Sequence, residues 1–336
     1  MNECFRQIVD VPKSGFVIEY QHKTIFLGSC FADNMGSRFA SGLLDCLTNP
    51  YGVAFNPASV GQALERMMNC APVDASELIE CNGLWHHPDF HGSFSRPGAD
   101  EVVAAVNRAT AAAHDYLREA DNVVLTFGTA WVYRLRSTGR VVANCHKLPQ
   151  DRFERERLRA DDIAVRWLGL LADLKSFGKP KNIILTVSPV RHVKDGAHGN
   201  AVSKSELLLA ADALERSGAV YYFPSFELMM DDLRDYRFYA DDYFHPNAMS
   251  VNYIMSKFME ATFDSTARSY HAEGAAIVRR LEHRPLNGLT AEYVAFMEQT
   301  LEQLKKLKVK YPLANVCTRI SELESQLSGL KDIKQL

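Results

Sequence analysis

Short apolar runs that suit buried strands alternate with longer helical patterns along most of this chain, and this alternation is what most restricts its fold. The strand-like runs are residues 24–27, 123–127, 183–187 and 220–223, with a further candidate at 44–47. Helical patterns are clearest at 101–119, 163–176 and 203–216. Strand and helix in alternation predict an α/β fold of three layers, in which helices cover both faces of a parallel central sheet.

The character of the sequence changes after residue 266. Apolar residues such as Met297, Leu301 and Leu304 recur at helical spacing, a second such run follows, and Pro312 separates the two. We therefore expect an α/β domain at residues 1–266 and a C-terminal helical extension at 267–336, folded as a helical hairpin. The hairpin is expected to pack on the main domain or on another copy of the chain, which would make a homo-oligomer.

Composition and charge narrow the functional classes. The chain has 336 residues with a formal net charge of -3 and a pI of about 6.4, which argues against nucleic acid as a partner. The N-terminus lacks the basic start and apolar run of a secretory signal, and no uncharged stretch approaches the length of a membrane span. The seven cysteines contain no C-x-x-C pair, as is typical of reduced thiols. We expect a cytoplasmic protein with no membrane partner.

The first strand runs directly into a turn that carries a hydroxyl beside a thiol. This turn is Gly28-Ser29-Cys30, and helix-forming residues follow it from Ala32. The carboxyl ends of parallel strands are where such folds bind ligands, and the N–H groups of the following helix stabilise a thiolate. The turn is therefore a candidate site for a nucleophile, although a buried cysteine after a strand is also common core filling.

A carboxylate and a histidine stand three residues apart near the end of the α/β region. In Asp242-x-x-His245-Pro246 the carboxylate can hold one ring nitrogen and leave the other free as a general base. The competing interpretation is a helix start, with His245 as the cap and Pro246 in the first turn. The presence of both elements in one α/β chain favours nucleophilic acyl chemistry.

The segment Phe26-Leu27-Gly28-Ser29-Cys30-Phe31-Ala32 resembles the signature of the GSCFA family, which is similar to a branch of the SGNH (GDSL-like) hydrolases. The resemblance covers most of residues 20–265. It implies a flavodoxin-like SGNH-hydrolase fold, with Cys30 at the position of the serine nucleophile, Ser29 at that of the aspartate, and Asp242 with His245 as the terminal pair. Ser29 is the alternative nucleophile if the turn differs by one residue.

The same resemblance implies donors for an oxyanion. Gly52 is similar to the glycine of the second SGNH block, and an ordinary turn glycine is the competing interpretation. Gly128 matches the third block, Gly-x-Asn-Asp, only at its glycine, because Ala130 stands where asparagine would donate. Thr129 is a further candidate donor. The missing asparagine is a departure from the superfamily pattern.

Other residues near these motifs are candidates for substrate contact. Trp131 can stack on a sugar ring, whereas His146 and Arg191 can pair with a carboxylate or phosphate. The histidine-rich segments also contain suitable metal ligands, namely His86, His87, Asp89, His91 and His146. Their spacing fits no standard zinc signature, so we expect no metal and favour substrate contact.

These features together predict an SGNH-like enzyme that cleaves ester bonds, of a carbohydrate or small molecule, through a covalent acyl-enzyme. A coenzyme A-dependent O-acyltransferase acting through the same residues is the first alternative. No phosphate-binding glycine loop is visible, so the coenzyme is expected only if that alternative holds, and otherwise we expect no cofactor. A non-catalytic carbohydrate-binding module is the second alternative, suggested by Ala130.

Overall fold

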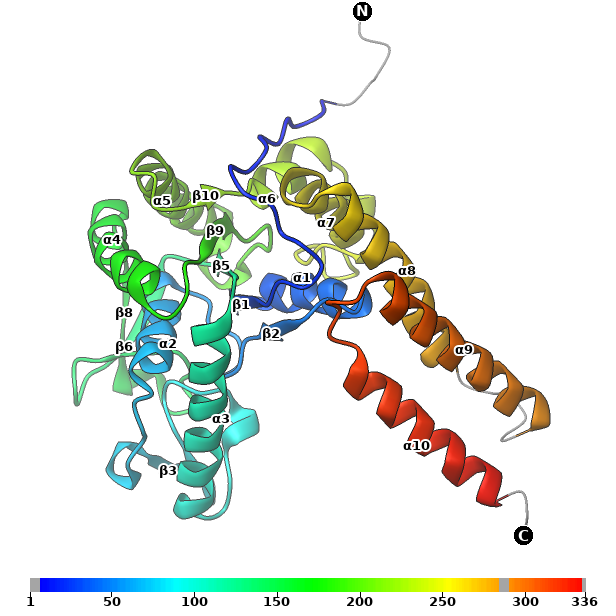
Figure 1. Ribbon diagram of the computed structural model, residues 1–336. Coiled ribbons are helices and arrows are strands. Elements are labelled where there is room, and N and C mark those ends of the chain that lie inside the picture. The colour runs from blue at the N-terminus through cyan, green and yellow to red at the C-terminus, as the bar shows by residue number, and fades with distance from the viewer. Residues whose placement is uncertain (1–6, 284–289, 334–336) are drawn as a thin grey trace, which may run out of the picture.

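The computed structural model, which describes residues 7–283 and 290–333, contains a parallel central sheet between two layers of helices (Figure 1). The sheet has the order β2-β1-β5-β9-β10, and every neighbouring pair is parallel. This is the flavodoxin-like order. Its strands are β1 (Thr24–Gly28), β2 (Cys46–Thr48), β5 (Asn122–Phe127), β9 (Asn182–Val187) and β10 (Tyr221–Tyr222). The predicted three-layer α/β fold is confirmed.

Both faces of the sheet are buried, which explains why its strands appear as nearly continuous apolar runs. Alternate residues point to opposite faces: Ile25 and Leu27 join one core, and Phe26 joins the other. The first face is covered by α2 (Pro57–Asn69), α3 (Ala99–Glu119), α4 (Ala160–Ser176) and α5 (Gly196–Arg216). The second is covered by α1 (Cys30–Ser41), α6 (Ser225–Glu227) with the short π-helix Leu228–Asp232, and α7 (Ala248–Thr262).

Two small antiparallel units project from the carboxyl side of this sheet. One is a three-stranded sheet of order β7-β6-β8, built from β6 (Trp131–Leu135), β7 (Val141–Val142) and β8 (Phe153–Arg157). The other is the hairpin of β3 (Ile79–Cys81) and β4 (Leu84–His86). Short 3₁₀ helices occupy Ala75–Glu77, Gly92–Phe94, Gln150–Arg152, Val193–Asp195 and Tyr236–Phe238. The sequence analysis did not predict these strands, because they are short and the longer two, β6 and β8, contain charged residues instead of a continuous apolar run.

The C-terminal region forms three helices, α8 (Ser265–Leu281), α9 (Ala291–Lys310) and α10 (Cys317–Ile333). Helices α9 and α10 pack through Met297, Leu301, Leu323 and neighbouring apolar residues, as the predicted hairpin requires. Helix α8 lies against the end of α1, where the Tyr270 hydroxyl donates to the Leu43 carbonyl at 2.8 Å. The predicted boundary at residues 266/267 stays a prediction, and parts of both predicted domains lie outside the described residues.

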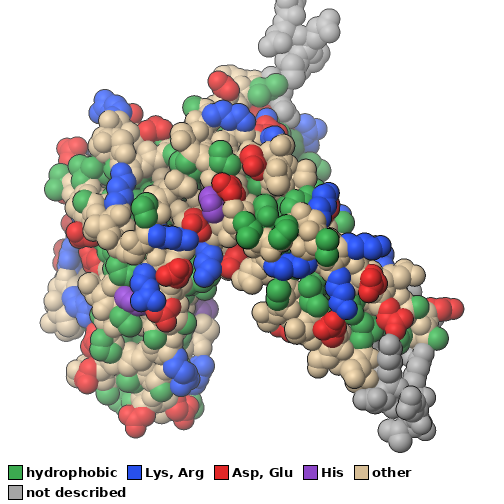
Figure 2. Space-filling view, viewed as in Figure 1, with side chains coloured by type: hydrophobic (Ala, Val, Ile, Leu, Met, Phe, Trp, Pro, Cys, Tyr) green, Lys and Arg blue, Asp and Glu red, His purple; other side chains and the backbone are tan. Residues whose placement is uncertain are grey.

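The C-terminal helices form an arm that stands apart from the carboxyl edge of the sheet. Figure 2 shows a broad notch between this arm and the lobe that carries α2, α3 and the β3–β4 hairpin. Within the described part of the chain, no helix is both long and apolar enough to cross a membrane. Association of copies through the arm remains a prediction.

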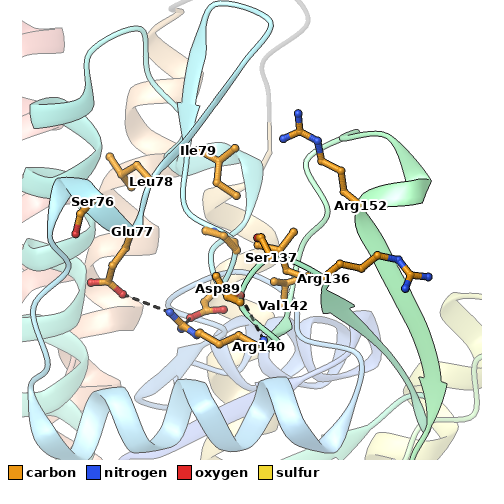
Figure 3. Close-up of a pocket in the computed structure, with 13 residues that line it drawn as sticks. Ser76, Glu77, Leu78, Ile79, Asp89, Arg136, Ser137, Arg140, Val142 and Arg152 are labelled. Atoms are coloured by element: carbon orange, nitrogen blue, oxygen red, sulfur yellow. Dashed lines mark hydrogen bonds and ion pairs between the residues drawn. The ribbon is translucent and has the colours of Figure 1, made fainter.

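A cluster of charges ties the β3–β4 hairpin to the three-stranded sheet. Figure 3 shows Arg140 between Glu77 and Asp89. The Arg140 guanidinium lies 3.7 Å from the Glu77 carboxylate and 2.9 Å from that of Asp89, and all three residues line a cavity of about 560 Å³. Arg66 approaches the same two carboxylates from α2. His87 is buried in this cluster, and its Nδ1 accepts the backbone N–H of Asp89 at 3.0 Å. The cluster therefore fixes the segment between the hairpin and the central sheet.

The buried His87 should make the protein sensitive to acid. Burial, assisted by the nearby Arg66, holds the pKa of His87 well below its usual value. As the pH falls below about 6.5, the unfolded chain therefore binds a proton that the folded chain does not, and the free energy of unfolding decreases. His87→Asn should weaken this dependence, because an amide oxygen can accept the same N–H without titrating. Urea unfolding at several acidic pH values measures how the free energy of unfolding depends on pH in the wild type and in His87→Asn. An equal dependence in the two proteins would contradict this role of His87.

Candidate functional site

A cavity of about 640 Å³ opens at the carboxyl ends of three neighbouring strands. Cys30 follows β1, Thr129 follows β5, and His192 follows β9; all three line this cavity. His245 reaches it from the loop before α7. Residues from the arm do not line the cavity in the described structure. The parallel sheet thus brings together segments that lie far apart in the sequence.

The turn that presents Cys30 depends on glycine at position 28. Gly28 has φ +140°, and a Cβ atom there would lie 2.1 Å from the Thr126 carbonyl oxygen on β5. Ser29 then caps α1, with its hydroxyl accepting the Phe31 N–H at 3.3 Å, and Cys30 is the first residue of the helix. The Phe31 and Ala32 N–H groups bond to Ser29, whereas the Cys30 N–H has no backbone carbonyl partner among the described residues and lies beside its own thiol at the positive end of the helix.

The two candidate nucleophiles differ in their surroundings. Ser29 is only 1% exposed, and its hydroxyl is engaged as the helix cap. Cys30 is partly exposed and lines the cavity. The geometry therefore favours Cys30 as the group that a ligand meets.

Opposing influences act on the Cys30 thiol. Burial, and then the charge of Asp33, raise its pKa, whereas the nearby backbone N–H groups and Lys204 lower it. The net pKa is raised, so the thiol stays largely protonated near neutral pH and needs a base to react.

Asn49, which sequence analysis did not single out, supports this turn from β2. Its side-chain oxygen accepts the Gly28 N–H at 2.8 Å, while its amide donates to Asp33 at 2.6 Å. One side chain thereby fixes both the nucleophile turn and the carboxylate beside it. A polar residue directly after a short strand was the only signal that could have identified it.

Asp242 and His245 form the predicted pair. The Asp242 carboxylate accepts the N–H groups of Phe244 and His245 at 2.9 and 3.0 Å, and its other oxygen lies 2.6 Å from His245 Nδ1. The backbone bond from His245 is the largest of the contributions that lower the pKa of Asp242 to about 2. An ionised Asp242 keeps the proton on Nδ1 and leaves Nε2 free to act as a base. The competing role as helix cap falls to Asn247, which caps α7.

Cys30, at the start of α1, and His245, in the loop before α7, line the same cavity. Among the described residues, the Cys30 thiol makes no hydrogen bond with His245. Catalytic hydrogen bonds are often long without substrate, so a ligand or water between the two groups can complete the relay.

The backbone N–H groups of the predicted oxyanion donors are hydrogen-bonded within the fold. The Gly52 N–H donates to the Asn49 carbonyl at 2.8 Å within a turn, and Gly52 does not line the cavity. The N–H groups of Gly128 and Thr129 both donate to the Phe55 carbonyl at 2.8 Å. The Thr129 hydroxyl lies 3.0 Å from the Ser203 hydroxyl. These N–H groups are engaged within the fold, so the Cys30 N–H at the start of α1 is the better candidate donor.

The remaining predicted residues divide into two groups. Trp131 and Arg191 line the cavity, and Trp131 has the Arg155 guanidinium 4.4 Å from its ring centre. His146 instead stacks on His86, with Nε2 2.8 Å from the His87 carbonyl, and does not line the cavity. Within residues 7–283 and 290–333, no group of three or more His, Cys, Asp or Glu side chains is arranged to hold a metal ion.

Two further residues lie around the proposed chemistry. His192 has its pKa lowered to about 4, first by burial and then by the charge of Lys204, so it stays neutral near pH 7. Lys204 lies on α5 and is buried beneath the cavity. In the sequence, Lys204 has the helical spacing of the apolar residues Leu207 and Ala211. This spacing was the signal that its side chain is buried and is stabilised by protein groups instead of water.

Comparison with known proteins agrees with the motif at the start of α1. The model of the GSCFA family matches residues 23–258, which include the whole cavity lining. A second model, described as the GSCFA domain protein, C-terminal domain, matches residues 275–329 in the arm. No curated protein matches the chain. Because the first match covers more than half of the sequence, the chain belongs to the GSCFA family.

Proposed function

We propose that this protein cleaves ester bonds through a covalent acyl-enzyme on Cys30. The observation that carries the proposal is that one cavity is lined both by a thiol at a helix N-terminus and by a histidine whose other nitrogen is held by a carboxylate. Nucleophile, base and orienting carboxylate are the three parts of an acyl-transfer site.

The proposed reaction runs in two halves. His245 Nε2 accepts the thiol proton as Cys30 Sγ bonds to the ester carbonyl carbon, giving a tetrahedral oxyanion. The C–O bond then breaks, and the alkoxide takes the proton from His245 as the acyl group stays on sulfur. Water then attacks the thioester with His245 as base, which releases the acid and restores the thiol.

The N-terminus of α1 is the proposed source of oxyanion stabilisation. Cys30 is the first helical residue, so its N–H has no carbonyl partner within the helix and lies beside the reacting sulfur. The positive end of the helix dipole adds to this field. This arrangement supplies a donor despite Ala130, whose side chain cannot donate.

The charge of the cavity favours substrates that carry an anionic group. Arg155 is neutralised by Asp195, with which it forms an ion pair. Arg191 and Lys194 also line the cavity, and neither has an acidic side chain within ion-pair distance among the described residues. Two unbalanced cations in a chain of net charge -3 support a carboxylate or phosphate on the substrate.

Intact-mass measurements after brief exposure to p-nitrophenyl acetate test the nucleophile. We expect an acetyl adduct in the wild type and in Ser29→Ala, but none in Cys30→Ala. Ser29→Ala should also lower the free energy of unfolding by about 0.5–2 kcal/mol, because it removes the cap of α1. Adduct that persists in Cys30→Ala would remove this residue from the mechanism, and absence of both adduct and p-nitrophenol in the wild type would favour a binding module.

The fate of an acetyl thioester on Cys30 distinguishes hydrolysis from acyl transfer. If acetyl-coenzyme A loads Cys30 and water does not discharge the thioester until an alcohol is added, the acyltransferase alternative holds.

Replacement of His245 or Asp242 tests the base. His245→Ala should reduce p-nitrophenol release by about 10²- to 10⁴-fold, and Asp242→Asn should also reduce it, because both variants lose the oriented imidazole. Thermal unfolding of each variant should show an intact fold. His198→Ala is the matched control, since His198 is exposed on α5 and lines neither this cavity nor the one shown in Figure 3. Wild-type rates in His245→Ala would contradict the role of this residue.

The charge argument is tested with paired esters that differ only in one carboxylate. Arg191→Ala and Lys194→Ala should each raise KM for the anionic ester by about tenfold, as expected for one lost charge-assisted contact, and leave the neutral ester little changed. Equal effects on the two esters would show that these cations do not select the substrate.

A further inference from the structure

Lys204 is an unusual residue because its side chain is enclosed within the protein. Its exposed fraction is 2%, and it lies on the buried face of α5 together with Leu207 and Ala211. Lysine is almost never fully buried unless its charge is compensated, since transfer of an ammonium out of water is costly. Some feature of the surrounding structure must therefore compensate it.

The ammonium group lies where two strands of the sheet end. Lys204 Nζ donates to the Gly128 carbonyl at 2.7 Å and to the Ser188 carbonyl at 2.6 Å, directly after β5 and β9. Among the described residues, no carboxylate lies within ion-pair distance of Nζ. The two carbonyls compensate part of the charge, and the ammonium also lies 5.8 Å from the centre of the Phe226 ring.

Cys30 is the titratable group that acts on this lysine. It follows β1, which pairs with β5, and the Gly128 carbonyl that accepts from Lys204 directly follows β5, so both groups lie at the carboxyl edge of the sheet. Burial lowers the pKa of Lys204 to about 7, and Cys30 opposes that shift. The interaction is reciprocal, since the charge of Lys204 lowers the pKa of the thiol.

Other charges around the thiol come from several elements. Asp33, on α1, raises the pKa of the Cys30 thiol. Lys204 is the cation that acts on the thiol from beneath the cavity. The remaining titratable groups that line the cavity with Cys30 are His91, Tyr133, Cys145, Arg155, Arg191, His192, Lys194, Asp195 and His245.

We propose that Lys204 is a positioning residue that supplies the counter-charge of the Cys30 thiolate from beneath the cavity. It takes no part in the proton transfer: the thiol proton goes to His245, and the ammonium form of Lys204 stabilises the anion that remains on sulfur. The inference rests on the proposed function for its purpose, but the electrostatic coupling exists whether or not an acyl group is transferred.

The pH dependence of Cys30 alkylation tests the coupling without any substrate. Peptide mapping after timed exposure to iodoacetamide gives the rate at Cys30, with the other cysteines as internal references. In Lys204→Met the apparent pKa of Cys30 should rise by about one unit or more, so that alkylation near neutral pH slows about tenfold. Asp33→Asn is the matched control of opposite sign, and it should lower the apparent pKa.

If Lys204 had only a structural role, Lys204→Met and Asp33→Asn would not shift the pH profile of Cys30 alkylation in opposite directions. An unchanged Cys30 profile in folded Lys204→Met would overturn the proposal. If the variant does not fold, NMR of lysine side chains in the wild type and Cys30→Ala gives the reciprocal measurement. The pKa of Lys204 should be lower in Cys30→Ala, and equal values would overturn the proposal.

The outcome is separable from that of the proposed function. A shifted alkylation profile in Lys204→Met, together with a wild type that never forms an acetyl adduct, would support the coupling and reject the acyl-enzyme. An acetyl adduct in the wild type, together with an unshifted alkylation profile in Lys204→Met, would support the acyl-enzyme and reject the coupling.

Discussion

Parallel hydrogen bonding of β1 to β5, and of β5 to β9, is the constraint on which the site depends. The register pairs Gly28 with Thr126, so β1 and β5 end side by side and the nucleophile turn begins against the carbonyl of Thr126. That contact leaves no room for a side chain at position 28. A change in this register would move Cys30 away from the residues that follow β5 and β9, and these residues would no longer line one cavity together.

Charge compensation is the second organising feature of this edge of the sheet. A carboxylate on α1 and an ammonium from α5 act on the same thiol with opposite sign, and both are held by uncharged partners, Asn49 for Asp33 and two strand-end carbonyls for Lys204. Among the described residues, Asp33 and Lys204 therefore do not neutralise each other in a buried salt bridge. Its field is available to a group that becomes charged during a reaction.

The structure around the cavity comes from segments with few periodic signals. The three-stranded sheet contributes Trp131, Tyr133 and Arg155, and the charge cluster shown in Figure 3 ties the neighbouring hairpin to it. Strands of two to five residues gain their stability from pairing with each other rather than from local preference, so their sequences carry little of the pattern that identifies longer elements. The cavity wall was for this reason not predictable.

The sequence by itself determined the alternation of strand and helix, the helical hairpin at the C-terminus, and the two motifs around Cys30 and His245, because each depends on local periodicity or on residues close in the chain. Only the tertiary structure decided which backbone N–H groups remain free near Cys30, that His146 lies outside the cavity, and that Lys204 lies beneath the thiol. Those facts depend on hydrogen-bond partners and burial contributed by distant segments.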